Sequence, residues 1–382
     1  MRRVWEASPQ VQAARAELDA ARARAQAAAQ PLYNPSLDLS AENADVNRRT
    51  AGLSLTLDLS GKRRARANQG QANLRVSEAS YTLLRRDIAA QWLTAWSTAT
   101  LAARQAELGR QRLAMMKRFD ELAAKRLKIG VISSPERDLA GLALGEARVQ
   151  QATLEGNEAA ARASLVAIGG KMAGRLPPLP QVLPPHAESV RPRPLDELPK
   201  LVQARSQLAS AQAGVTVARR ARIPDPTLSL TGGQVRNGPI TDQVIGLSVS
   251  IPLPVLNTGR AEVAAANAEV SAASASMRAK TQLARATLQE AQARYNALRS
   301  AAKAFRQGRA AAFEERTALL EKLWRAGEIG TSDYLIQLKQ SLDTALSGQE
   351  LESRTWRAWF DYLTAAGRLV DWIHGRPQDI SR

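Results

Sequence analysis

The chain contains an internal repeat, which limits the folds open to it more than any other feature of the sequence. Residues 9–40 read PQVQAARAELDAARARAQAAAQPLYNPSLDLS, and residues 199–231 read PKLVQARSQLASAQAGVTVARRARIPDPTLSLT. Each segment starts at a proline (Pro9 or Pro199), continues through an Ala- and Arg-rich stretch that favours helix, and ends in the pattern Pro-x-Leu-x-Leu. Because the segments that follow also correspond, the chain is predicted to consist of two equivalent halves.

A second strand follows the repeated segment in each half. In AGLSLTLDLS (residues 51–60) and in residues 244–253, apolar side chains alternate with small or polar ones. This period of two predicts strands with one apolar face. Pro252 and Pro254 would end the later strand, because proline cannot donate to a ladder of hydrogen bonds. The apolar face comprises Leu53, Leu55, Leu57 and Leu59 in the first half, and Ile245, Leu247, Val249 and Ile251 in the second.

Each second strand leads into an unusually long helical stretch. Residues 63–128 contain no proline, and at 1.5 Å per residue they would form a helix about 100 Å long. Residues 259–324 predict a helix of similar length. Ordinary globular helices have about 11–12 residues, so this length is typical of coiled coils or of the staves of a helical barrel.

Each long helix ends in a tight turn and is followed by another helix. The turns read RLKIGVISSPERDL (residues 126–139) and LWRAGEIGTSDYL (residues 323–335). Gly130 and Gly327 suit the left-handed position that ends a helix. Ser133 and Glu136 have the spacing of a capping box. The sequence therefore predicts two helical hairpins with narrow tips.

A proline-rich segment separates the two halves and predicts an extended linker. We expect a first repeat over residues 1–170 with its tip near 129–134, a linker over 171–198, a second repeat over 199–367 with its tip near 327–332, and a C-terminal tail over 368–382.

Composition excludes several kinds of site. The 382 residues contain no cysteine, which rules out a disulfide framework, a thiolate metal site or a cysteine nucleophile. His186 and His374 have no partner at metal-ligand spacing, and no run of 18 apolar residues predicts a membrane-spanning helix. We therefore predict no enzyme, no cofactor and no metal centre. The net charge of +17 is spread along helical faces.

Four alternating strands need something to cover their apolar face. A small sandwich packed on a helix is one solution. The other is a membrane: the strand lengths fit the roughly 9–11 residues of a transmembrane strand, but four strands cannot close a barrel when the smallest have about eight. Three chains would pool their strands into one closed barrel of twelve, and no edge would face lipid.

These motifs, in their duplicated order, resemble those of the TolC-like outer-membrane efflux family over nearly the whole chain. They are most similar to the outer-membrane subunits of heavy-metal (cobalt–zinc–cadmium type) efflux systems. The resemblance is carried by both hairpin tips and by two strand motifs, Asn34-Pro35-x-Leu37-x-Leu39 and Ser250-Ile251-Pro252-Leu253-Pro254.

The resemblance implies a mainly α fold with a small β part. Long α-helical hairpins would act as barrel staves, and four transmembrane strands per chain would join a twelve-stranded β-barrel in a homotrimer. It also implies an exit duct in the outer membrane with a periplasmic extension. The partners would be outer-membrane lipid, a periplasmic adaptor (membrane fusion) protein and an inner-membrane pump of the resistance–nodulation–division (RND) type, without nucleic acid. The cargo would be metal cations or small toxic compounds.

The hairpin tips hold the candidate functional residues. The resemblance places aperture carboxylates at the spacing of Asp333 and Glu136, where rings of three would attract cations. Both acids could instead only stabilise a helix N-terminus. We expect seven tip residues to contact the adaptor: Arg126, Leu127, Gly130, Ser133, Gly327, Gly330 and Thr331. Several of them could instead serve only to form the turn between the two helices.

Two other functions share some of these features. An outer-membrane duct of a type I secretion system would have the same architecture. A basic coiled-coil scaffold or nucleic-acid-binding protein would fit the charge and the Ala-rich helices, but it would leave the duplicated strands unexplained. No apolar stretch of a secretory signal follows the basic start of the sequence, so the outer-membrane location rests on the resemblance.

Overall fold

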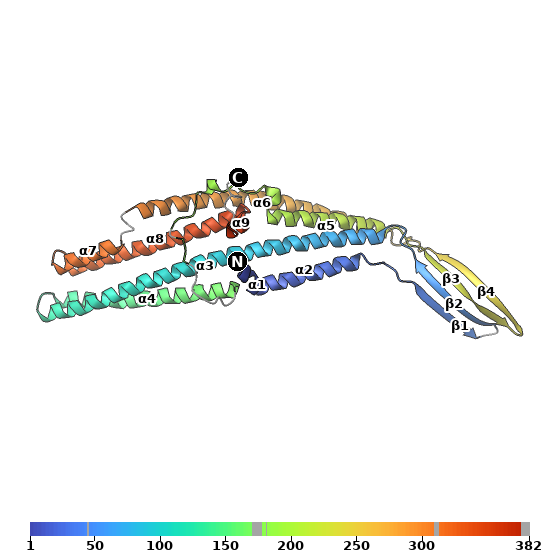
Figure 1. Cartoon of the computed structure of the whole chain (residues 1–382), viewed down its shortest axis with the longest axis horizontal. Coiled ribbons are helices and arrows are strands. Elements are labelled where there is room, and N and C mark those ends of the chain that lie inside the picture. The colour runs from blue at the N-terminus through green and yellow to red at the C-terminus, as the bar shows by residue number, and fades with distance from the viewer. Residues whose placement is uncertain (44–45, 170–177, 181, 309–312, 376–382) are drawn as a thin grey trace. The chain divides into compact units, whose positions relative to one another are not determined.

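The computed structural model describes residues 1–43, 46–169, 178–180, 182–308 and 313–375, and most of these are helical (Figure 1). Short 3-10 turns cover Ala187–Ser189 and Leu195–Glu197. The helices are α1 (Arg2–Ala7), α2 (Pro9–Ala28), α3 (Lys62–Lys128), α4 (Ser134–Gly169), α5 (Pro199–Ala221), α6 (Arg260–Gln307), α7 (Phe313–Arg325), α8 (Thr331–Ala365) and α9 (Leu369–Ile373).

Four strands lie side by side in one antiparallel sheet (Figure 1). They are β1 (Ser36–Asn43), β2 (Val46–Thr56), β3 (Thr227–Asn237) and β4 (Ile240–Ser250), and they pair in the order β1-β2-β3-β4. The central pair, β2 with β3, joins the two halves of the sequence. The predicted fold class, mainly α with a small β part, is confirmed.

The second strand of each pair ends earlier than the sequence predicts. β2 ends at Thr56, so Leu57 and Leu59 follow it. The chain has already turned there, because the Asp58 carboxylate accepts the first backbone N–H groups of α3, each at 2.8 Å. β4 ends at Ser250, so Ile251 also follows its strand, immediately before Pro252.

The two long helices differ. α3 is continuous over 67 residues. The expected helix over 259–324 is instead described as α6 and α7, and residues 309–312 lie outside the described residues. α6 ends just before Gly308, a residue type with low helix propensity. Within the described part of the chain, no helix is both long and apolar enough to span a bilayer.

The chain forms two compact units. The first comprises Met1–Gln12, Leu84–Pro194 and Ala284–Arg382, and we call it the tip unit because it contains both helical turns. The second comprises Ala13–Leu83 and Leu195–Leu283, and we call it the sheet unit. Each takes segments from both halves of the sequence. The expected boundary of the first repeat at residue 170 lies outside the described residues.

A buried ion pair joins the two halves of the sheet unit where the strands meet the helices. Asp225 precedes β3, and its side chain is only 3% exposed. One of its carboxylate oxygens accepts hydrogen bonds from Lys62 Nζ and from the Tyr33 hydroxyl, both at 2.8 Å. Since Tyr33 precedes β1 and Lys62 begins α3, one carboxylate fixes three chain segments at the base of the sheet.

In the tip unit, part of the proline-rich segment packs on aromatic side chains. The Tyr362 hydroxyl of α8 donates to the carbonyl oxygens of Ala187 and Val190, at 3.0 and 3.2 Å. The Tyr295 hydroxyl of α6 donates to the carbonyl oxygen of Pro185 at 2.5 Å. These bonds give backbone carbonyl groups of this segment side-chain partners, and they hold the segment against α6 and α8.

Candidate functional site: hairpin tips and sheet faces

The first hairpin tip is closed by a helix C-cap. Gly130 has φ +73°, a left-handed conformation that suits glycine. The N–H of Val131 returns to the carbonyl oxygen of Arg126 at 2.9 Å, and that of Gly130 returns to Leu127 at 3.0 Å. This closure leaves Ile129 and Val131 exposed by 74% and 61%. These two apolar residues are additional to the tip residues predicted from the sequence, and the alternation in Ile129-Gly130-Val131 is the local signal for them.

The Glu136 carboxylate caps the next helix. One of its oxygens accepts hydrogen bonds from the backbone N–H and the hydroxyl of Ser133, both at 2.8 Å. The bonds from the Ser133 backbone and hydroxyl, together with one from the Thr331 hydroxyl, hold the pKa of Glu136 below its ordinary value. The carboxylate therefore stabilises the start of α4.

The second tip has the same closure and a buried threonine. Gly327 has φ +78°, and the N–H of Glu328 returns to the carbonyl oxygen of Leu323 at 3.0 Å. Thr331 begins α8 and is only 3% exposed; its hydroxyl accepts the indole N–H of Trp324 at 3.3 Å. Asp333 is exposed in the first turn of the same helix, beside Gly330.

Arg126 connects the two tips. Its Cζ lies 4.3 Å from the centroid of the Trp324 ring, and its guanidinium donates to the carbonyl oxygen of Arg325 at 3.1 Å. Trp324 belongs to a cluster of three aromatic residues. Phe119 of α3 is 4.5 Å from Trp324 and 5.0 Å from Tyr334 of α8, between ring centroids. Burial of this cluster raises the pKa of Tyr334 to about 12.

Ion pairs continue this connection along the helices. Lys339 of α8 donates to Glu146 of α4 at 2.6 Å, and Arg112 of α3 lies 3.9 Å from the same carboxylate. The hydrogen bond from Lys339 is the main reason that the pKa of Glu146 is lowered. These residues were not predicted from the sequence, because no local motif marks an ion pair between helices that are far apart in the chain.

The sheet has one apolar and one polar face. Register places Leu37, Leu53, Leu230 and Leu247 in one row across the four strands, and the adjacent rows add Leu55, Leu228, Val249, Leu39 and Ile245. All of these side chains are exposed. On the other face, hydroxyl groups bond across strands, as in Ser36 with Ser54 at 2.7 Å and Thr56 with Thr227 at 2.8 Å.

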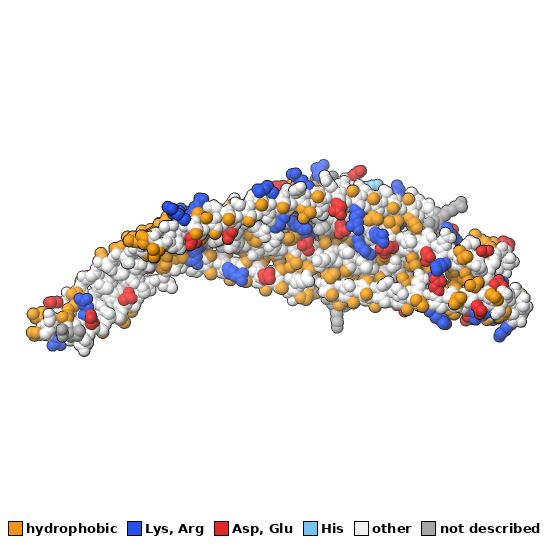
Figure 2. Space-filling view, turned by 180° about the vertical axis from the view of Figure 1, so that it is seen from behind, with side chains coloured by type: hydrophobic (Ala, Val, Ile, Leu, Met, Phe, Trp, Pro, Cys, Tyr) orange, Lys and Arg blue, Asp and Glu red, His pale blue; other side chains and the backbone are white. Residues whose placement is uncertain are grey.

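Figure 2 shows where side chains gather on the surface of the sheet unit. Hydrophobic side chains collect where the strands adjoin the helices, and charged ones collect towards the hairpin ends of the strands. Leu253 and Leu256, just after β4, are 76% and 99% exposed. By register, the last apolar row runs from Leu39 to Ile245, so the apolar face ends before the hairpin loops.

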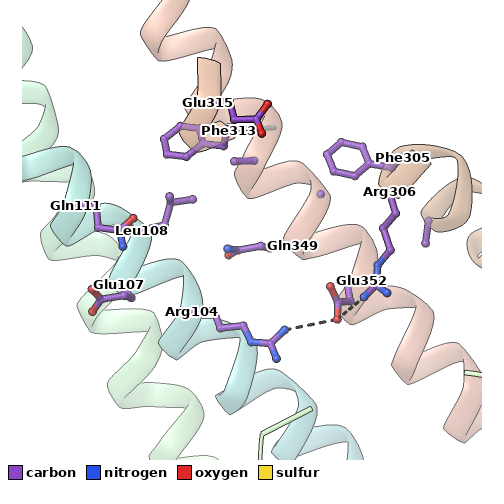
Figure 3. Close-up of a pocket in the computed structure, with 13 residues that line it drawn as sticks. Arg104, Glu107, Leu108, Gln111, Phe305, Arg306, Phe313, Glu315, Gln349 and Glu352 are labelled. Atoms are coloured by element: carbon purple, nitrogen blue, oxygen red, sulfur yellow. Dashed lines mark ion pairs between the residues drawn. The ribbon is translucent and has the colours of Figure 1, made fainter. Parts of the chain in front are cut away.

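A polar cavity of about 650 Å³ lies among helices of the tip unit (Figure 3). Glu352 of α8 pairs there with Arg104 of α3 at 3.5 Å and with Arg306 of α6 at 3.1 Å. These ion pairs join α3, α6 and α8 across the cavity. Within the described residues, no group of three or more potential ligand side chains is arranged to hold a metal ion.

Comparison with known proteins shows one family and one fold. Residues 2–171 and 192–356 match the family described as "Outer membrane efflux protein". The cobalt-zinc-cadmium resistance protein CzcC of Cupriavidus metallidurans is 26% identical over 247 residues, which are 62% of this chain and 58% of that protein. The match thus spans less than two thirds of that relative.

Solved structures resemble nearly the whole chain. A membrane protein from Pseudomonas aeruginosa has a TM-score of 0.78 at 20% identity, over 96% of this chain and 92% of that one. The outer membrane channel CmeC of Campylobacter jejuni has a TM-score of 0.77 at 14% identity, over 99% of this chain and 89% of that one. At these identities the likeness concerns the fold.

Proposed function

Because the chain belongs to the outer membrane efflux protein family, we propose that three copies assemble into an exit duct through an outer membrane. The observation that carries this proposal is the sheet, which combines an exposed apolar face with two unpaired edges, β1 and β4. Unpaired backbone groups are costly in lipid. Joining β4 of each copy to β1 of the next would close a barrel of twelve strands, with the leucines towards lipid and the hydroxyl groups towards the lumen.

The helices would continue the duct into the periplasm. Each repeat, over residues 1–170 and 199–367, would supply two strands and one helical hairpin. The described parts of the linker (residues 178–180 and 182–198) and of the tail (residues 368–375) would form a belt around the helical barrel. The hydrogen bonds from Tyr362 and Tyr295 to the linker support this position, because they fasten it to α8 and α6.

The hairpin tips would receive a periplasmic adaptor, which links the duct to an inner-membrane RND pump. Exposed Leu127, Ile129 and Val131 offer apolar contacts at the first tip. Gly130, Gly327 and Gly330 let another hairpin approach closely. Since Thr331 is buried and Arg126 is engaged within the chain, these two would support the tips more than contact the adaptor directly.

Asp333 would line the aperture at the periplasmic end, where three copies would form a ring of carboxylates. Its exposure in the first turn of α8 supports this assignment. Glu136 is the weaker candidate for the gate, since its carboxylate already accepts hydrogen bonds from Ser133.

The cargo would be metal cations. The name of the relative, a cobalt-zinc-cadmium resistance protein, supports this. The polar face of the sheet supports it independently. By register, that face carries the described strand residues Asp38, Glu42 and Asp242 against one basic residue, Arg48. A lumen with excess carboxylate attracts cations and repels anions.

The mass of the assembly tests the proposal. The full chain would be expressed behind a secretory signal, extracted from membranes in detergent and weighed by light scattering. We expect a species of three times the 41.3 kDa chain from the outer-membrane fraction. A monodisperse monomer that never enters the membrane fraction would refute the duct.

A further inference from the structure

Two arginines follow the apolar rows of the sheet on the same face. Register places Arg49 of β2 beside Gln234, one row beyond Ala51 and Gly232. Arg236 of β3 lies one row further, so the two guanidinium groups are diagonal neighbours, about 7–8 Å apart at the backbone. Both side chains are exposed. The rows of apolar side chains on this face therefore end, towards the hairpin loops, at a pair of positively charged side chains.

A hollow adjoins this pair on the same face. It has a volume of about 430 Å³. The small residues Ala51 and Gly232 leave it open, and a Cβ on Gly232 would meet only the Val244 carbonyl oxygen, at 3.9 Å. The residues around it that lie on the apolar face are Leu39, Ala41, Arg49, Ala51, Gly232 and Gln234.

The nearby carboxylates of the described strands lie on the opposite face. Asp38, Glu42 and Asp242 alternate with the leucine-bearing positions, so the pleat directs them away from Arg49 and Arg236. The hydrogen bond from Ser54 to Asp38, at 3.1 Å, confirms that Asp38 belongs to the hydroxyl-bearing face. The apolar face thus combines an open hollow with two cations from the described strands.

We propose that this corner of the sheet binds a lipid with a phosphate headgroup from the surrounding bilayer. Arg49 and Arg236 would hold the phosphate, because a planar guanidinium donates two parallel hydrogen bonds to phosphate oxygens. One acyl chain would lie in the hollow between Leu39 and Arg49. This inference rests on the proposed function, since only a sheet that faces lipid presents this corner to a bilayer.

Charge and shape together select a lipid over a dissolved anion. A free phosphate would use the two arginines but not the apolar hollow. An uncharged lipid would use the hollow but not the arginines. The position also suits a headgroup, because the arginines lie at the end of the apolar rows and their stems can extend towards the membrane surface.

Native mass spectrometry of the full chain in detergent tests the site. The protein would be titrated with didodecanoyl phosphatidic acid and, separately, with didodecanoyl glycerol, which has the same chains without phosphate. We expect tighter binding of the phosphatidic acid. Each of the variants R49Q and R236Q should weaken it about tenfold or more, as for loss of a hydrogen bond to a charged group. Gly232→Leu, which fills the hollow, should weaken both lipids.

Arg48→Gln is the matched control, because it removes the same charge one residue away on the opposite face. Binding unchanged in R48Q supports the site. An equal loss in R48Q and R49Q, equal binding of the two lipids, or displacement by inorganic phosphate alone would each overturn it.

Flotation with phosphatidylcholine vesicles separates this inference from the proposed function. If the wild-type chain floats and phosphatidic acid is not preferred, the lipid site fails and the duct stands. If the wild-type chain does not float, the proposed function itself fails, and the lipid site fails with it.

Discussion

Arg126, in the last turn of α3, lies over the indole ring of Trp324, in the last turn of α7, with its Cζ 4.3 Å from the ring centroid. The two residues belong to different halves of the sequence. The guanidinium also donates to the carbonyl oxygen of Arg325, at the C-terminus of α7, where a positive charge is favoured by the helix dipole. One side chain thus joins the two hairpin tips.

Replacing Arg126 should therefore loosen the tips. We expect Arg126→Gln to lower the free energy of unfolding of the tip unit by about 1–2 kcal/mol, from the lost cation–π contact and the lost hydrogen bond. Hydrogen exchange at the amides of Gly327 and Glu328 would report the change locally. Lys128→Gln is the control, since Lys128 is an exposed basic residue in the same helical turn. Equal effects of the two variants would contradict a specific contact.

The cap at Glu136 should fail in acid. Hydrogen bonds from Ser133 and Thr331 lower the pKa of this carboxyl in the folded chain below its ordinary value of 4.5. A lowered folded-state pKa contributes stability above the ordinary value, and this stability is lost as pH falls through the folded-state pKa. We expect faster exchange of the Ser133 amide below that pH in the wild type, and already at neutral pH in Glu136→Ala. Asp138→Ala, two residues later, should leave the amide protected.

The buried pair at the base of the sheet should be costly to break. Asp225→Ala leaves Lys62 and Tyr33 without their shared acceptor, and the Lys62 side chain is only 17% exposed. We expect a loss of about 3–5 kcal/mol in the free energy of unfolding of the sheet unit. The double variant Lys62→Met/Asp225→Leu should recover most of it, because no charge stays buried. A double variant no more stable than Asp225→Ala would contradict this explanation.

The helices and strands could be predicted from the sequence far better than the contacts between them. Alternation in residues 51–60 and the capping spacing of Ser133 and Glu136 are local patterns, and both led to structure that is present, with the strand placed a few residues too late. The contact between Arg126 and Trp324 joins residues from different halves, and nothing near either residue marks it. Pairing of β2 with β3 was likewise invisible, because register depends on contacts across the whole chain.

The same distinction applies to the candidate gate. The local capping spacing to Ser133 already made Glu136 the weaker gate candidate in the sequence, and the structure shows the Glu136 carboxylate accepting hydrogen bonds from Ser133. In the proposed duct, Asp333→Ala should raise the basal single-channel conductance and reduce the preference for cations, because a ring of negative charge is removed. Asp343→Ala, on the same helix and also exposed, is the control. Unchanged conductance and selectivity in Asp333→Ala would remove Asp333 from the gate.

The apolar face of the sheet gives the sharpest test of the membrane assignment. Leu53 and Leu230 are direct partners in the register of β2 and β3, and both are exposed. Replacing both with Asp would place two carboxylates against lipid, where charged side chains are expensive. We expect the double variant to be lost from the outer-membrane fraction, while far-UV circular dichroism of the purified chain retains its helix signal.

Ser54→Asp with Ser229→Asp is the matched control, because these residues are the next pair in the same register but lie on the hydroxyl-bearing face. In the proposed duct these carboxylates would face the lumen, so the control should still assemble as a trimer. If both double variants assemble equally well, the leucines do not face lipid. If both fail equally, added charge rather than the identity of the face decides the outcome, and the assignment of the two faces is wrong.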